Sequence, residues 1–237
     1  MEWNDEAIVL SMRRHGESAA IVHLLTRDHG RTAGLVRGAS GRELRGVLQP
    51  GNEVEAWWKA RLADHLGHLR CELRAAHAAA VLGDGGRLAC LASACALADV
   101  ALPEREPNPG VHETLGDLLR TLAKPGWAAR YAYWELRLLE ELGYGLDLAK
   151  CAVTGLQSDL IYVSPRSGRA VSAAAGAPYR DRLLGLPGFL LTGETASDGE
   201  ISNALALTGY FLERHVFAPQ NALMPAARQR LVDRFGA

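Results

Sequence analysis

Residues 7–38 read AIVLSMRRHGESAAIVHLLTRDHGRTAGLVRG, and this stretch decides the fold of the N-terminal part of the chain. Its aliphatic segments are short and are separated by the turn signals HGE at 15–17 and DHG at 28–30. Two more β-rich segments follow the turn signal PGN at 50–52. The predicted strands are 7–12, 19–26, 31–38, 53–62 and 67–76. Short strands at this spacing predict a small all-β barrel over roughly the first 80 residues.

The fourth predicted strand, EVEAWWKARL, alternates with a period of two, which is typical of a strand with one buried face. The face expected in the core carries Val54, Ala56, Trp58, Ala60 and Leu62. The face expected in solvent carries Glu55, Trp57, Lys59 and Arg61.

After about residue 80 the pattern becomes helical, and a domain boundary is expected there. One apolar stripe on the segment WAARYAYWELRLLEELGYG predicts a helix that Gly143 caps. The stripe carries Trp127, Tyr131, Trp134, Leu138 and Leu142. Other expected helices are 87–102, 181–186, 200–216 and 225–235, and a hairpin arm at 160–163 with its turn at 164–168 interrupts them.

Composition bounds the class of protein. Of the 237 residues, 48% are hydrophobic and 22% are charged, which suits a globular chain with a sizeable core. The longest apolar run, 88–102, is shorter than the roughly 20 residues that cross a bilayer, and the N-terminus lacks a secretion signal. We therefore expect no membrane association. The cysteines follow no disulfide-like spacing, so reduced thiols in a cytoplasmic protein are expected; they are Cys71, Cys90, Cys95 and Cys151.

The net charge of −1 averages over an uneven distribution. Between residues 13 and 45, seven arginines stand against three carboxylates, a local charge of +4, so the rest of the chain sums to −5. Guanidinium groups clustered on a β-barrel are suited to phosphate oxygens. The candidate nucleic-acid-binding arginines are Arg13, Arg14, Arg27, Arg31, Arg37, Arg42 and Arg45.

Three stretches in this order resemble the RecO family of recombination mediators. They are the opening AIVLSMRRHGES…IVHLLTRDHGRTAGLVRGAS, then LQPGNEVE, then WELRLLEELGYGLDLAKCAVTG. The resemblance implies an α+β chain: an OB-fold β-barrel at 1–80, then a mainly helical domain at 81–237 with a small β insertion at about 151–175. It also implies binding of single- and double-stranded DNA, strand annealing, and loading of recombinase onto DNA coated with single-strand-binding protein. RecR and single-strand-binding protein are the implied partners.

The chain departs from the family in one informative way. Many members hold a structural zinc in the inserted segment with two Cys-x-x-Cys pairs, but here only Cys151 remains and Thr154 takes the second position. Because tetrahedral zinc needs four nitrogen or sulfur donors, we expect no metal and no cofactor. Packing is expected to hold the segment instead, through Leu156, Leu160, Tyr162 and Val171.

Each candidate site has an alternative interpretation. The early arginines could be a solvated β-surface, and Arg37 could be structural in the turn at Gly38; residues 37–45 are expected to form a mobile basic loop. Trp57 lies beside Lys59 and Arg61 on the polar face, where an indole can stack on an unpaired base or pack on a nearby loop. Arg130 and Arg137 on the polar side of the helix near 127–142 are candidates for binding the tail of single-strand-binding protein, or are ordinary solvated residues.

No compact set of nucleophile, base and carboxylate occurs, so we expect a protein without enzymatic activity. A basic β-barrel does not distinguish nucleic acids by itself, so a factor that binds structured RNA, for example on tRNA or the ribosome, is an alternative. A scaffold that only bridges partners is a third possibility, which DNA binding at low salt would exclude.

Overall fold

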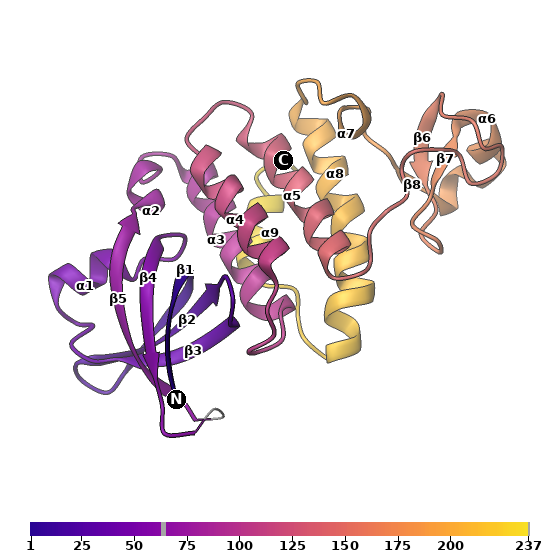
Figure 1. The fold of residues 1–237 in the computed structure, drawn as a ribbon. Helices are drawn as coiled ribbons and strands as arrows, with labels where there is room; N and C mark the ends of the chain where they lie inside the picture. Colours follow the sequence, from indigo (N-terminus) through magenta and orange to yellow (C-terminus); the bar gives the residue numbers. More distant parts are fainter. Residues whose placement is uncertain (63–64, 237) are drawn as a thin grey trace. The chain divides into compact units, whose positions relative to one another are not determined.

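The computed structural model describes residues 1–62 and 65–236, which form two compact units. The first unit comprises Met1–Pro125 and Pro225–Leu231, and the second comprises Gly126–Met224 and Val232–Ala237. Figure 1 shows the elements of each unit. None of the helices in the described part of the chain is long and apolar enough to cross a membrane.

The first unit begins with a closed five-stranded barrel in the order β1-β2-β3-β5-β4, the arrangement of an OB-fold. Neighbouring strands are antiparallel except β3 and β5, which are parallel. Its elements are β1 (Glu2–His15), β2 (Ala19–Thr26), β3 (Gly30–Val36), the short helix α1 (Arg42–Val47), β4 (Glu53–Lys59) and β5 (Gly67–Ala75). The expected α+β class with an N-terminal OB-fold is confirmed.

The barrel core forms because alternate strand residues point inward. Val9, Val22, Leu24 and Val54 are fully buried there, and Trp58 is 4% exposed. The expected inward direction of Trp58 is thus confirmed, whereas Leu62, at 55% exposed, is not a core residue. Strand β4 ends at Lys59, so the alternation that pointed to Leu62 stops before it.

Helices complete the first unit. They are α2 (His77–Ala80), α3 (Gly85–Ala101), α4 (Pro109–Thr121) and α9 (Ala226–Val232). Asp84 caps α3 by accepting hydrogen bonds from the backbone N–H groups of Gly86 and Arg87. Both α3 and α4 contact strands β1 and β2. Helices α3 and α4 belong to the same compact unit as the barrel. The domain limits 1–80 and 81–237 stay a prediction.

Residues 37–45 were expected to form a mobile basic loop, but 42–45 lie in a helix and only 37–41 form turns and a bend. Arg42 begins helix α1, and the helix is anchored at its C-terminal end. The side chain of Asn52 donates hydrogen bonds to the carbonyls of Gly46 (2.9 Å) and Val47 (3.3 Å), and Leu48 is fully buried. These contacts supply the order that the basic composition of the segment does not reveal.

The second unit contains two long packed helices, α5 (Trp127–Glu141) and α8 (Asp198–Phe211). Tyr131, Trp134 and Leu138 of the predicted stripe are buried, and Gly143 adopts the left-handed conformation of a helix end. Helix α8 continues through a π-helical turn (Leu212–Phe217), and a 3-10 turn (Ala218–Gln220) follows it. The helix expected at 200–216 is confirmed.

The small β insertion also belongs to the second unit. Strands β6 (Leu160–Val163), β7 (Ala170–Ser172) and β8 (Leu184–Gly185) form a sheet in the order β7-β6-β8. Helix α6 (Ala173–Gly176), a 3-10 turn (Ala177–Arg182) and helix α7 (Phe189–Thr192) accompany them.

Two expectations for the insertion were wrong. The helix expected at 181–186 is instead the end of a 3-10 turn followed by strand β8, which pairs with β6. Leu160 and Val171 are buried as expected, but Leu156 is 60% exposed because it lies in an irregular segment outside the small sheet.

Candidate nucleic-acid interface

Five of the seven candidate arginines lie at one end of the barrel. Arg14 pairs with Ala20 across β1 and β2, and Ala20 pairs with Val36 across β2 and β3. The ends of β1 and β3 therefore lie on either side of the start of β2, and a hydrogen bond from Ser40 N to Ser18 O (3.4 Å) holds the following segment there. This surface, here called the basic end, carries Arg13, Arg14, Arg37, Arg42 and Arg45.

The side chains of the basic end are exposed and keep most of their donors free. Among the described residues, none of these five guanidinium groups forms an ion pair with a carboxylate. Arg45 donates from Nη2 to the carbonyl of Ser40 at 2.7 Å, which fixes its position without neutralising its charge. Glu17 and Glu43 are the nearby acidic residues in the sequence and are also exposed. The basic end can therefore bind phosphate oxygens with little competition from within the unit.

Arg27 and Arg31 are not part of the basic end. They flank the turn between β2 and β3, where Thr26 pairs with Gly30, at the opposite end of these strands. Arg27 is exposed, whereas the side chain of Arg31 is only 16% exposed. Arg31 donates from Nε to the carbonyl of Leu102 at 2.8 Å and lies 3.5 Å from Asp99 and 3.8 Å from Glu104.

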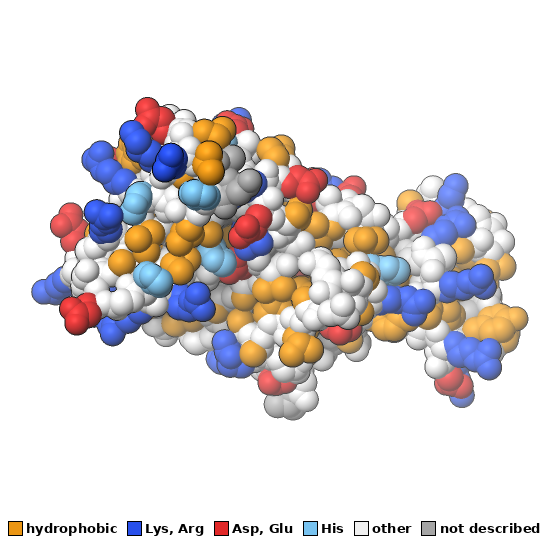
Figure 2. Space-filling view, turned by 90° about the horizontal axis from the view of Figure 1, so that it is seen from below, with side chains coloured by type: hydrophobic (Ala, Val, Ile, Leu, Met, Phe, Trp, Pro, Cys, Tyr) orange, Lys and Arg blue, Asp and Glu red, His pale blue; other side chains and the backbone are white. Residues whose placement is uncertain are grey.

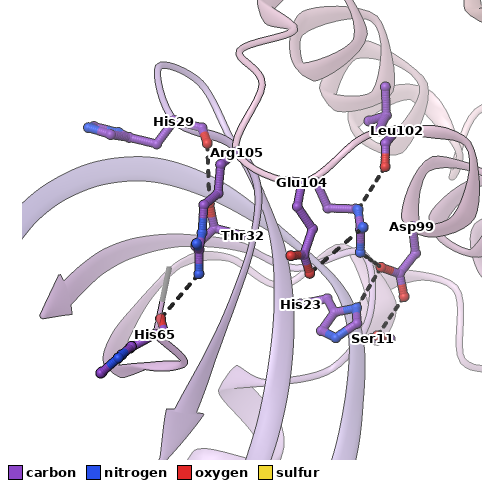
Figure 3. A network of polar contacts seen from close by, with 10 residues as sticks. Ser11, His23, His29, Thr32, His65, Asp99, Leu102, Glu104 and Arg105 are labelled. Carbon is purple, nitrogen blue, oxygen red and sulfur yellow. Dashed lines mark hydrogen bonds and ion pairs between the residues drawn. The ribbon is translucent and has the colours of Figure 1, made fainter. Parts of the chain in front are cut away.

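Asp99 is the centre of this polar network, which joins helix α3 to the barrel (Figure 3). Oδ2 accepts a hydrogen bond from Ser11 Oγ at 2.8 Å, and Oδ1 lies 2.7 Å from Nδ1 of His23. Burial by itself raises the pKa of Asp99, but the hydrogen bonds from His23 and Ser11 and the charges of His23 and Arg31 outweigh it, so the pKa lies below its ordinary value. The network accounts for Arg31 as a structural residue.

The sequence contained one signal for this network. Asp99 is the single carboxylate in the apolar sequence of α3, and a buried carboxylate needs partners. Which strand residues supply those partners follows only from the packing of α3 on the barrel.

Trp57 lies on the outer face of the barrel, as its place in the alternation predicts. The guanidinium of Arg70 lies 5.0 Å from the centre of its ring. Lys59 forms an exposed ion pair with Glu2 at 2.8 Å, and Arg61 is exposed beyond the end of β4. Arg70 is a cation beside the indole that the sequence analysis missed, because its position depends on the register of β4 with β5.

The two arginines expected to bind a partner differ in setting. Arg137 is exposed, forms an ion pair with Glu140 at 2.6 Å, and lines a hollow of about 330 Å³ with three leucines. Arg130 is partly buried at the other end of α5 and does not line this hollow. The full lining is Leu136, Arg137, Glu140, Gly145, Leu146, Asp147 and Leu148.

Both the N-terminal and the C-terminal parts of the chain match models of one protein family. The family models "Recombination protein O N terminal" and "Recombination protein O C terminal" match residues 1–76 and 82–224. The chain belongs to the RecO family. Proteins named DNA repair protein RecO are similar to it: that of Rhodospirillum centenum is 55% identical over 99% of this chain and 95% of the relative, and that of Rhodospirillum rubrum is 52% identical over 99% and 96%. The Caulobacter vibrioides protein is 48% identical over 99% and 97%.

In this member of the RecO family, hydrogen bonds to Cys151 help hold the inserted segment together. The thiol is buried, and Sγ accepts from the backbone N–H of Ser172 at 3.3 Å. Hydrogen bonds from Ser172 and Thr154 lower the pKa of Cys151 to about 6. Within residues 1–62 and 65–236 no cluster of three His, Cys, Asp or Glu could hold a metal ion. The absence of zinc stays a prediction, which elemental analysis of the purified protein tests.

Proposed function

We propose that this RecO family protein is a DNA repair and recombination mediator that binds DNA through the basic end of its OB-fold. The observation that carries the proposal is the set of five exposed guanidinium groups without carboxylate partners. Arginine pairs with phosphate oxygens without regard to base sequence, so both single- and double-stranded DNA are expected ligands. The DNA-repair names of its relatives support the same role.

The same charge can promote annealing. Two complementary strands repel each other through their phosphates, and a cationic surface that neutralises phosphate lowers this barrier. The bases remain available because arginine contacts the backbone. We propose that the protein acts in this way on DNA coated with single-strand-binding protein, together with RecR, and so helps load recombinase at the nucleoid.

The salt dependence of DNA binding tests the site. In the Arg13→Ala, Arg14→Ala, Arg42→Ala, Arg45→Ala variant we expect weaker binding, and a slope of log K against log salt that is smaller by roughly 3. The matched control removes four exposed arginines from the second unit: Arg166, Arg180, Arg182 and Arg214. Equal effects of both variants would show that only total charge matters, and an unchanged basic-end variant would place the DNA site elsewhere.

A second experiment distinguishes the alternatives of an RNA-binding factor and of a scaffold. We expect single-stranded DNA to compete at least as well as RNA of the same length for the labelled protein–DNA complex, and we expect annealing of coated DNA to depend on RecR. Strong preference for structured RNA would support the RNA-binding alternative. Absence of DNA binding at low salt would support the scaffold.

We also propose that the second unit binds the acidic, apolar tail of single-strand-binding protein. The hollow beside Arg137 combines leucine side chains with a cation, and a terminal carboxylate would have to replace Glu140 as the partner of Arg137; Asp147 also lines the hollow. We expect Arg137→Ala to weaken binding of a tail peptide severalfold and Arg130→Ala, outside the hollow, to leave it unchanged. The reverse result would move the site along α5.

A further inference from the structure

We propose that the outer face of β4 and β5 around Trp57 is a stacking platform for an unpaired base of single-stranded DNA. This inference rests on the proposed DNA binding. The basic end contacts phosphates, and the platform would contact a base. It assigns roles to Trp57 and Arg70.

Strand register brings the platform together. Trp57 of β4 lies between Arg70 of β5 and Asn4 of β1, and the neighbouring row holds Lys59 between His68 and Glu2. All of these side chains point outward, because Trp58 and Leu69 of the same strands are buried in the barrel. An exposed aromatic ring with a cation beside it, here Arg70 on the neighbouring strand β5, is a feature of single-strand-binding surfaces.

The platform is hollowed and in part apolar. A hollow of about 560 Å³ lies over it, lined by Glu2, Trp3, Asn4, Trp57, Trp58, Lys59, His68, Leu69 and Arg70. Figure 2, which shows the molecule from below, has hydrophobic side chains gathered on the barrel with histidine, lysine and arginine side chains around them. Arg70 already lies against the ring of Trp57, so the indole is held in place before a ligand arrives.

The platform is continuous with the basic end. A second hollow on the other side of β5 is lined by Arg37 and Leu44 and shares His68 and Arg70 with the first. A strand whose phosphates contact the basic end can therefore pass Arg37 and reach Trp57. The next row in the other direction places Glu55 between Glu6 and Glu72. Arg74 pairs with Glu6 and Glu55, and Arg70 pairs with Glu72, so the charges of this row are already largely balanced within the unit.

Charge indicates what the platform binds. Lys59 is paired with Glu2, and Arg70 is paired with Glu72, so these cations are largely neutralised within the unit. The platform is therefore poorly suited to phosphate and well suited to the flat face of a base. Bases in a duplex are stacked on each other and unavailable, so the platform should act on single strands alone.

The test measures binding of oligothymidine and of a duplex of equal length at several salt concentrations. We expect Trp57→Ala to weaken oligothymidine binding about tenfold, with the slope of log K against log salt unchanged and duplex binding unchanged. Trp57→Phe, which keeps an aromatic ring, should retain most of the affinity. Tyr179→Ala removes an exposed aromatic ring from the second unit and is the matched control.

Fluorescence supplies a second measurement in the folded wild type. Oligothymidine should quench tryptophan emission, and the quenching should be lost in Trp57→Phe although four other tryptophans remain. Oligothymidine affinity that is unchanged in Trp57→Ala, or duplex affinity that falls equally, overturns the platform while leaving the basic end intact. Loss of binding in the basic-end variant is independent of this outcome.

Discussion

Oδ1 of Asp99 in helix α3 lies 2.7 Å from Nδ1 of His23 in strand β2. The same carboxylate accepts from Ser11 on β1 and faces Arg31 on β3, so one side chain of the helix contacts three strands of the barrel. The helix that follows the OB-fold is thus attached to it by a part-buried polar network as well as by apolar packing. Such networks are costly to break because each remaining member stays desolvated.

Replacement of Asp99 should therefore destabilise the first unit. We expect Asp99→Ala to lower the free energy of unfolding by about 2 kcal/mol, since it leaves Ser11 and His23 without their acceptor. Asp99→Asn retains an acceptor oxygen and should cost less. Denaturant titration measures both, and equal stability of Asp99→Ala and wild type would contradict the structural role.

The network also predicts a pH dependence. The pKa of Asp99 is lower in the folded chain than its ordinary value, so the ionised carboxylate stabilises the fold above the pKa of the unfolded chain. This contribution is lost as the pH falls through the folded pKa. The difference in unfolding free energy between wild type and Asp99→Asn should shrink below about pH 4; a constant difference from pH 7 to pH 3 would refute it.

Arg31 and Arg14 should give opposite phenotypes. Arg31 is engaged with Leu102 and Asp99, so Arg31→Ala should lower the thermal midpoint and leave the salt slope of DNA binding unchanged. Arg14 is exposed, so Arg14→Ala should leave the thermal midpoint unchanged and reduce the slope of log K against log salt by roughly 0.7 to 0.9. Melting curves and binding isotherms on both variants decide this. If Arg31→Ala instead reduced the salt slope and left the thermal midpoint unchanged, Arg31 would belong to the DNA-binding site.

Two glycines in the barrel turns form a matched pair. Gly16 and Gly30 both have positive φ, but a Cβ on Gly30 would lie 2.1 Å from the backbone oxygen of Glu106, whereas one on Gly16 would meet nothing within 4 Å. We expect Gly16→Ala to cost about 1 kcal/mol and Gly30→Ala about 3 kcal/mol or more, because the second adds a backbone clash. Similar unfolding midpoints would contradict this.

The core of the second unit depends on a buried carboxylate. Glu135 of α5 is fully buried and accepts a hydrogen bond from Tyr131 Oη at 2.6 Å and another from Thr208 of α8. Glu135→Ala should destabilise the unit by about 3 kcal/mol, because it removes a buried acceptor that joins α5 to α8 and leaves a cavity in the core. Glu135→Gln keeps an acceptor and should be milder. If both variants melt like wild type, the carboxylate is not needed for packing.

Much of the secondary structure could be predicted from local pattern. The strand at 19–26 and the helix near 127–142 follow from alternation and from a stripe of large apolar residues, which are properties of neighbouring residues. The predictions failed where order depends on distant contacts. Helix α1 is held by Asn52, and strand β8 exists because β6 pairs with it.

Local sequence patterns predicted the barrel, the long helices that follow it, the concentration of arginine before residue 46 and the family to which the chain belongs. Only the tertiary structure divided that arginine cluster, because register and helix packing place five guanidinium groups at one end and turn Arg31 toward Asp99. It likewise put Arg70 beside Trp57. Charge and alternation are properties of neighbouring residues in the sequence, whereas the partner of each side chain depends on which strand or helix lies opposite it.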